Sequence, residues 1–104
     1  MKKLPPIHPG EILLEEFMKP LGLSQNALAR DLGVDARAVN QIVNGKRAIT
    51  ATMALRLARY FRMTPGFWMN LQARYDLEMA KDAVETEIRR VVKPRLMKVH
   101  QATV

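Results

Sequence analysis

The chain has 104 residues, a formal net charge of +7 and no cysteine. This length suits one hydrophobic core, so we expect residues 1–104 to form a single domain. The absence of cysteine excludes disulfide scaffolds and thiolate metal sites. No stretch has the length and apolar character of a membrane span, and Pro5 and Pro6 interrupt the region where a signal peptide would be apolar. We therefore expect a cytoplasmic protein with no membrane partner.

Positive charge gathers in the middle of the chain. Residues 24–62 carry seven basic and two acidic side chains, whereas residues 1–23 carry three of each kind and residues 63–104 carry seven basic and five acidic ones. Such a segment suits a polyanion, with nucleic acid first and an anionic membrane surface second. A solvated basic surface without a partner would have the same composition.

The first predicted helix begins near Pro9. A proline in the first turn and the acidic Glu11 favour a helix over about 9–19 that ends at Pro20, and Gly22 marks the turn that follows. Its expected buried side consists of Leu13, Leu14, Phe17 and Met18.

Two short helices follow. Ser24 is a favourable N-cap for a second helix through about Leu32, and Gly33 ends it. Asp35 caps a third helix that runs to about Asn44.

The remaining chain predicts two further helices. Thr50 caps the fourth, and Pro65 opens a longer fifth helix over about 65–92, followed by a loose tail at 93–104. The fourth helix has one apolar stripe, formed by Ala54, Leu57, Ala58 and Phe61. No strand is predicted, so the expected fold class is all-α with five helices.

Residues 24–44 have the pattern of a helix-turn-helix. Its two helices cross steeply, which requires a small side chain at the crossing and often a glycine in the turn, and Ala29 and Gly33 stand at these positions. The expected buried contacts are Leu28, Leu32, Val39 and Ile42. The outward side chains of the second helix, which can bind base edges, are Arg37, Asn40, Gln41 and Asn44. The alternative is an ordinary helical hairpin with a polar face.

Several stretches beside the helix-turn-helix carry a family pattern. They are His8-Pro9-Gly10-Glu11-Ile12-Leu13, Glu16-Phe17, Gly22-Leu23-Ser24, Gly45-Lys46-Arg47-Ala48-Ile49-Thr50, Met53-Ala54-Leu55-Arg56-Leu57-Ala58, Trp68-Met69-Asn70-Leu71-Gln72 and Tyr75-Asp76-Leu77. With them the chain resembles, from His8 to about Met79, the HigA-type antitoxins of bacterial addiction modules. These antitoxins are a branch of the phage-repressor-like (XRE-type) helix-turn-helix proteins. The resemblance implies a homodimer that represses the promoter of its toxin–antitoxin pair and neutralises a HigB-like toxin, a ribosome-associated mRNA endonuclease of the RelE type.

The resemblance also implies which residues face DNA, on an operator expected to be a near-palindrome. Those placed toward the major groove are Ala36, Arg37, Ala38, Asn40 and Gln41. Arg37 suits a guanine and Gln41 an adenine, while the methyl groups of the two alanines would meet thymine. Contacts to phosphates are expected from Gln25, Asn44, Lys46 and Arg47.

The fifth predicted helix carries two apolar rows. The row expected to close the core over the fourth helix consists of Trp68, Leu71, Tyr75 and Met79. A second row exceeds what a small core needs and predicts a dimer interface. This dimer seam consists of Leu77, Ala80, Val84, Ile88 and Val91. The alternative is that the seam folds back on its own domain.

No other residues indicate chemistry. His8 and His100 stand far apart in sequence without a positioned carboxylate or cysteine, so no metal site is predicted, and His8 is expected at the start of the first helix. The acidic residues of the first helix fit a solvated face and could also attract a basic toxin; they are Glu11, Glu15 and Glu16. No phosphate loop or nucleophile elbow is present, so neither an enzyme nor a cofactor is expected.

Two alternative functions stay open. A stand-alone helix-turn-helix transcriptional regulator without a toxin would share every DNA-facing residue. A protein-interaction module with an incidental basic face would bind no specific DNA.

Overall fold

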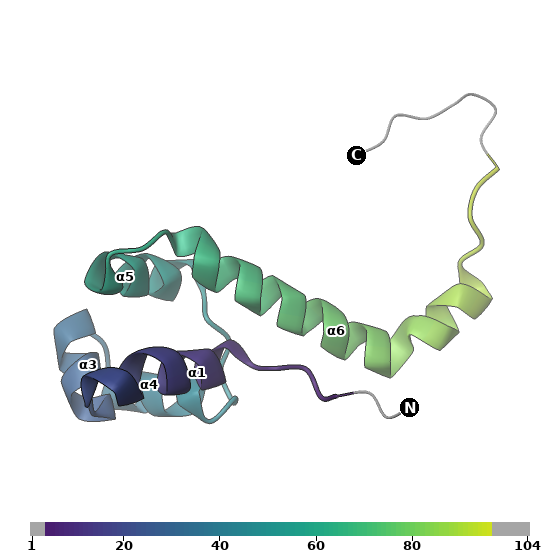
Figure 1. Ribbon diagram of the computed structural model, residues 1–104. Helices are drawn as coiled ribbons and strands as arrows, with labels where there is room; N and C mark the ends of the chain where they lie inside the picture. Colours follow the sequence, from purple (N-terminus) through teal and green to yellow (C-terminus); the bar gives the residue numbers. More distant parts are fainter. Residues whose placement is uncertain (1–3, 97–104) are drawn as a thin grey trace.

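The computed structural model describes residues 4–96, and every regular element within them is a helix. The prediction of an all-α fold with five helices is confirmed, the first helix being composed of three consecutive segments. In chain order the elements are α1 (Pro9–Ile12), η1 (Leu13–Met18), α2 (Lys19–Leu21), α3 (Gln25–Leu32), α4 (Ala36–Val43), α5 (Ala51–Phe61) and α6 (Pro65–Val91), as seen in Figure 1.

The first helix is longer than predicted, because it continues through Pro20 to Leu21. Its middle segment, η1, is a π-helix that ends with the N–H of Lys19 donating to the carbonyl of Leu14, five residues earlier. A proline inside an α-helix clashes with the carbonyl four residues before it. The wider π turn directly ahead of Pro20 leaves room for the ring, so the helix ends only at Gly22, which has a φ of 62°.

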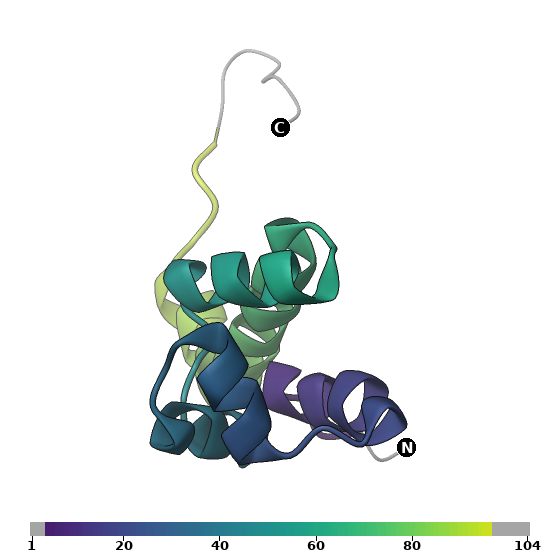
Figure 2. The same ribbon diagram turned by 90° about the vertical axis from the view of Figure 1, so that its left-hand side faces the viewer.

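The predicted starts of the other helices are confirmed. Ser24 Oγ accepts a hydrogen bond from the N–H of Ala27 at 3.0 Å, and Asp35 Oδ1 accepts one from the N–H of Arg37 at 3.1 Å. Gly33 follows α3 with a φ of 72°, a left-handed conformation that favours glycine. This turn lets α4 cross α3 in the helix-turn-helix (Figure 2).

Side chains from all five helices meet in one core. The four contacts expected within the helix-turn-helix are buried, and so are three of the four residues in the predicted α5 stripe. The fourth, Phe61, is half-buried against the core. Trp68 of α6 is fully buried, and its ring centroid lies 5.0 Å from that of Phe17 in η1. Burying a side chain of this size contributes about 1.5–3 kcal/mol to the free energy of unfolding, so α6 is needed to complete the core.

The two parts of α6 have different surroundings. The first part packs against α5 and α1 through buried Trp68 and half-buried Leu71 and Tyr75. Met79 is 45% exposed, which corrects its assignment to the core row. The row stops before it because the rest of α6 extends away from the other helices (Figure 1). The five residues of the dimer seam are exposed, so the alternative that the seam folds back on its own domain is wrong.

The chain beyond α6 is described only in part. Residues 92–96 have no regular secondary structure, and the rest of the predicted tail, with His100, lies outside the described residues. Of the described helices, none is long and apolar enough to cross a membrane. That residues 1–104 form a single domain stays a prediction.

Candidate nucleic-acid interface

α4 presents a polar face to solvent. Arg37 and Asn40 are exposed, Gln41 is half-buried, and exposed Asn44 follows as the C-cap. The opposite face of the helix is buried in the core, so the orientation of α4 is fixed. A guanidinium and side-chain amides are the groups that pair with guanine and adenine edges in the major groove. The exposed face of α4 can therefore read bases.

Ala38 does not belong to this face, which corrects the prediction that it meets thymine. Its exposed fraction is 7%, and it packs in the core beside Val39 and Ile42. Each helical residue is turned by about 100° from the last, so the inward positions of Val39 and Ile42 bring Ala38 inward as well. Ala36 is half-buried against the core, at the edge of the polar face. The expected base-facing set is thus reduced by one residue.

Two side-chain hydrogen bonds hold the polar face in place. Asn40 Nδ2 donates to Gln25 Oε1 at 3.0 Å, which ties α4 to the start of α3. Arg47 Nε donates to Gln41 Oε1 at 2.9 Å. Gln25 and Arg47, both predicted to bind phosphates, are thus each joined to a residue predicted to read bases. Restricting Asn40 and Gln41 before DNA arrives lowers the cost of ordering them on binding.

The loop after α4 carries the two basic residues predicted to bind phosphates. Lys46 and Arg47 are both exposed. Gly45, with a φ of 73°, turns the chain, and the N–H of Lys46 donates to the carbonyl of Gln41 at 2.8 Å. The loop therefore leaves α4 in a fixed direction and keeps its positive charge beside the polar face of α4.

Gln72 of α6 anchors the far end of this loop. It is 5% exposed, its Oε1 accepts the N–H of Ile49 at 2.8 Å, and its Nε2 donates to Asp76 Oδ1 at 2.9 Å. No role was predicted for Gln72. The available signal was an amide side chain one helical turn after Trp68, on the side of the helix expected to be buried, where a polar group requires a partner.

The first helix supports α4 from behind. Gly10 is buried, and a Cβ atom added to it would lie 1.7 Å from the carbonyl oxygen of Ile42 in α4. No other residue type permits the two backbones to approach so closely. The start of the first helix therefore fixes the position of the C-terminal end of α4.

His8 starts the first helix, as predicted. Its Nδ1 accepts the N–H of Gly10 at 2.9 Å, and its ring contacts Tyr75 edge-on with 4.8 Å between centroids. Burial lowers the pKa of His8 below its ordinary value of 6.5, against an opposing effect of Asp76. An Nδ1 that accepts a hydrogen bond carries no proton, so this cap requires the neutral imidazole.

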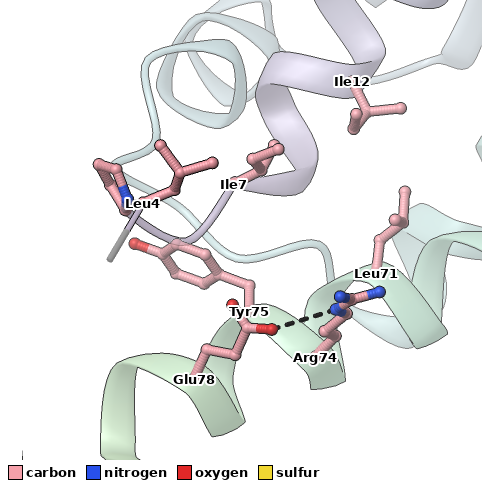
Figure 3. Close-up of a pocket in the computed structure, with 8 residues that line it drawn as sticks. Leu4, Ile7, Ile12, Leu71, Arg74, Tyr75 and Glu78 are labelled. Carbon is pink, nitrogen blue, oxygen red and sulfur yellow. Dashed lines mark hydrogen bonds and ion pairs between the residues drawn. The ribbon is translucent and has the colours of Figure 1, made fainter. Parts of the chain in front are cut away.

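A pocket lies between the N-terminal segment and α6 (Figure 3). Leu4 and Ile7 line it from one side and Tyr75 from the other. The charged lining residues, Arg74 and Glu78, form an ion pair with each other at 3.1 Å. Within residues 4–96, no group of three or more His, Cys, Asp or Glu side chains could hold a metal ion. The pocket therefore offers an apolar surface beside one internally paired set of charges.

Comparison with known proteins agrees with this geometry. Residues 14–68 match the family described as Helix-turn-helix. The chain is 53% identical over 79 residues to virulence-associated protein I of Dichelobacter nodosus, a match that covers 76% of this chain and 73% of that protein. It is 35% identical over 97 residues to antitoxin HigA-1 of Vibrio cholerae, covering 93% of this chain and 90% of that protein.

A solved structure supports the same relationship. The chain is similar to the Pseudomonas aeruginosa antitoxin HigA, solved with the higBA promoter, with a TM-score of 0.86 and 49% sequence identity. This match covers 88% of this chain and 99% of that chain. The family match spans more than half of the chain and includes both helices of the helix-turn-helix. The chain therefore belongs to the helix-turn-helix family, in the branch formed by the HigA antitoxins.

Proposed function

We propose that the protein is a HigA-type antitoxin, a DNA-binding autorepressor that also neutralises a RelE-type mRNA endonuclease. One observation carries the DNA-binding part, namely an exposed polar face on a helix held by α3 and the first helix. The likeness to an antitoxin solved with its promoter supports it. The protein acts in this proposal by binding and not by catalysis.

In the proposed complex α4 lies in the major groove of operator DNA. Arg37 pairs with a guanine, and Gln41 or Asn40 with an adenine, each good pair contributing about 1–3 kcal/mol of discrimination. Asn44 and Lys46 contact phosphates and fix the register. Gln25 and Arg47 act together with the base-reading residues to which they are bonded.

The operator complex requires a dimer, which we place at the seam of α6. One helix-turn-helix reads few base pairs, and repressors of this type bind two half-sites about one helical turn apart. The seam lies about half a turn around the helix from Tyr75, which faces the core. Its larger residues are 43–60% exposed, at Leu77, Val84, Ile88 and Val91. An exposed apolar row of this length is best explained by a second copy.

The toxin-binding part rests on the family and on charge. Glu11, Glu15 and Glu16 are exposed on the first helix, where Glu15 accepts from Lys19 Nζ at 2.8 Å. This acidic face is available to a basic toxin and is separate from the polar face of α4. Since operator DNA and translated mRNA share the bacterial cytoplasm, the proposal places the protein there.

Footprinting on the DNA upstream of its own gene tests the DNA-binding part. We expect protection of two half-sites about one helical turn apart. An absence of protection, with the protein folded, would refute the repressor and leave a protein-interaction module.

Co-expression with a neighbouring RelE-like gene tests the toxin part. We expect Arg37→Ala/Gln41→Ala to lose repression and still rescue growth, since the toxin would bind elsewhere. A wild-type protein that protects the operator but rescues no such toxin would be a stand-alone regulator.

A further inference from the structure

A second basic surface lies at the C-terminal end of α5. Arg56, Arg59 and Arg62 follow one another at intervals of three residues, and all three are exposed. Together with Tyr60 and the end of α3 they line a shallow pocket. We refer to these three arginines as the α5 arginine patch.

The patch has a surplus of positive charge. The acidic residue that lines the pocket, Asp31, accepts a hydrogen bond from the Tyr60 hydroxyl at 2.7 Å and also pairs with Arg30 at 3.9 Å. Arg59 and Arg62 have no ion pair or side-chain hydrogen bond with any residue in the described part of the chain. Two guanidinium groups at the pocket are thus available to an anion.

One wall of the pocket is held rigidly. Arg56 Nη1 donates to the carbonyl of Leu32 at 2.6 Å, at the C-terminal end of α3. This bond fixes α5 to α3 and places a positive charge where the helix dipole of α3 is negative. Arg56 therefore has a structural role, whereas Arg59 and Arg62 are available to bind a ligand.

The backbone at Arg62 is the second, independent observation. Arg62 has a φ of 58°, and it is the single non-glycine residue with a positive φ among those described. Such a conformation favours glycine, and this chain uses glycine at the equivalent C-cap positions of the first helix and of α3, at Gly22 and Gly33. A side chain kept where glycine would be more stable indicates a function for that side chain.

We propose that the α5 arginine patch binds the phosphodiester backbone of a nucleic acid, as a contact additional to that of α4. Guanidinium groups bind phosphate oxygens in pairs, and phosphate contacts supply most of the affinity of such sites. An acidic protein partner would also require an apolar anchor at the centre of the site. Of the lining residues with apolar groups, Leu32 is only 6% exposed, and Tyr60, which is 36% exposed, has its hydroxyl bonded to Asp31.

The bound phosphates would differ from those beside α4. The loop with Lys46 and Arg47 precedes α5, whereas Arg62 follows its last residue, about 16 Å further along the helix axis. In Figure 2, α5 lies in the upper part of the helical domain and α4 in its lower part. The phosphodiester could come from DNA that flanks the operator or from a separate RNA strand.

The test compares Arg59→Gln/Arg62→Gln with Lys93→Gln/Arg95→Gln, which removes the same charge from the exposed segment after α6. The probes are a duplex limited to the α4 footprint, the same duplex with random flanks, and a random single-stranded RNA. We expect the patch variant to lose about tenfold in affinity and about two in the salt slope on the flanked duplex or on the RNA. Loss on the flanked duplex identifies DNA as the source, and loss on the single-stranded RNA identifies RNA. The control variant should stay near wild type.

Three outcomes would overturn the proposal. They are unchanged affinity on all three nucleic acids, an equal loss in the control variant, and a loss confined to a polyglutamate peptide, which is measured as a fourth probe. Arg62→Gly separates folding from binding, because glycine suits the positive φ at this position and should raise the melting temperature, whereas loss of the guanidinium should still weaken binding to the flanked duplex or to the RNA. If the wild-type protein does not bind the operator but binds RNA through Arg59 and Arg62, the autorepressor proposal fails and the proposal for the α5 arginine patch is supported.

Discussion

The DNA-facing part of the molecule and the second half of α6 are stabilised in different ways. In the first, hydrogen bonds join residues far apart in sequence, such as Gln72 and Ile49. In the second, the ion pairs join residues three or four apart, such as Arg89 with Glu85 at 3.6 Å. Exposed pairs of this kind contribute only about 0.3–0.5 kcal/mol each. One region is thus held by its own tertiary structure, whereas the other is a helix whose apolar face needs a partner.

Gly10→Ala should damage the first region most. The added Cβ meets the carbonyl oxygen of Ile42, which belongs to the backbone and cannot rotate away, so we expect a loss of about 3 kcal/mol or more in the free energy of unfolding. Operator affinity should fall with it, because α4 is displaced. The matched control is Gly66→Ala, whose Cβ would have only Thr64 Oγ1 at 4.0 Å. Denaturant unfolding measures both, and equal stability of the two variants would contradict the close contact.

Val84→Asp/Ile88→Asp should disrupt the second half of α6 as a dimer interface and leave the fold of the DNA-facing part intact. Both residues lie on the seam and are 43% and 49% exposed in one copy, so their burial in a dimer would contribute about 2–3 kcal/mol per protomer. We expect a helical monomer, by light scattering and circular dichroism, with weak operator binding. Met79→Asp/Thr86→Asp adds the same charge on the side of α6 away from the seam, at two exposed positions, and should stay dimeric. A Val84→Asp/Ile88→Asp dimer of wild-type mass would place the interface elsewhere.

Gln72→Leu should destabilise the loop after α4, which carries Lys46 and Arg47, without unfolding the core. It leaves the N–H of Ile49 buried without an acceptor, which costs about 1–3 kcal/mol. Asp76→Ala removes the other hydrogen bond of Gln72 and should cost less, since Asp76 is exposed. Thermal unfolding ranks the two variants, and a larger loss for Asp76→Ala would show that the loop does not depend on Gln72.

The smallest effect is a pH dependence at His8. Because burial lowers the pKa of His8 in the folded protein, its contribution to stability is complete above 6.5 and declines as the pH falls below that value, where the unfolded chain binds the proton first. His8→Asn keeps a capping side chain and removes the titration. We expect the variant to lose less stability than wild type just below 6.5. Parallel stability curves for the two proteins would exclude His8 as the group responsible.

Local signals made most of the fold predictable. Caps such as Ser24 and Asp35 act within three residues, so helix starts could be identified from sequence alone. The end of the first helix was missed, because the π segment that accommodates Pro20 has no sequence signal of its own. Met79 was misplaced because helical spacing alone does not show where α6 leaves the core.

The site was predictable only where local signals define it. The polar face of α4 follows from the helical period. The resemblance placed Ala38 toward the major groove, although the helical period puts it on the inward side with Val39 and Ile42, and it is buried. Gly10 and Gln72 act on residues 32 and 23 positions away, on Ile42 and Ile49, and only the folded chain brings them together. The positive φ of Arg62 is likewise invisible in the sequence, since glycine is the residue expected there.

The most direct test of base reading by α4 is a comparison of Arg37→Ala with Lys46→Ala on operator and random duplexes. Arg37→Ala should lose about 1–3 kcal/mol on the operator and little on random DNA, because it removes a base contact. Lys46→Ala should weaken both and lower the salt slope by about one, because it removes a phosphate contact. Equal losses on the two duplexes for Arg37→Ala would contradict base reading by α4.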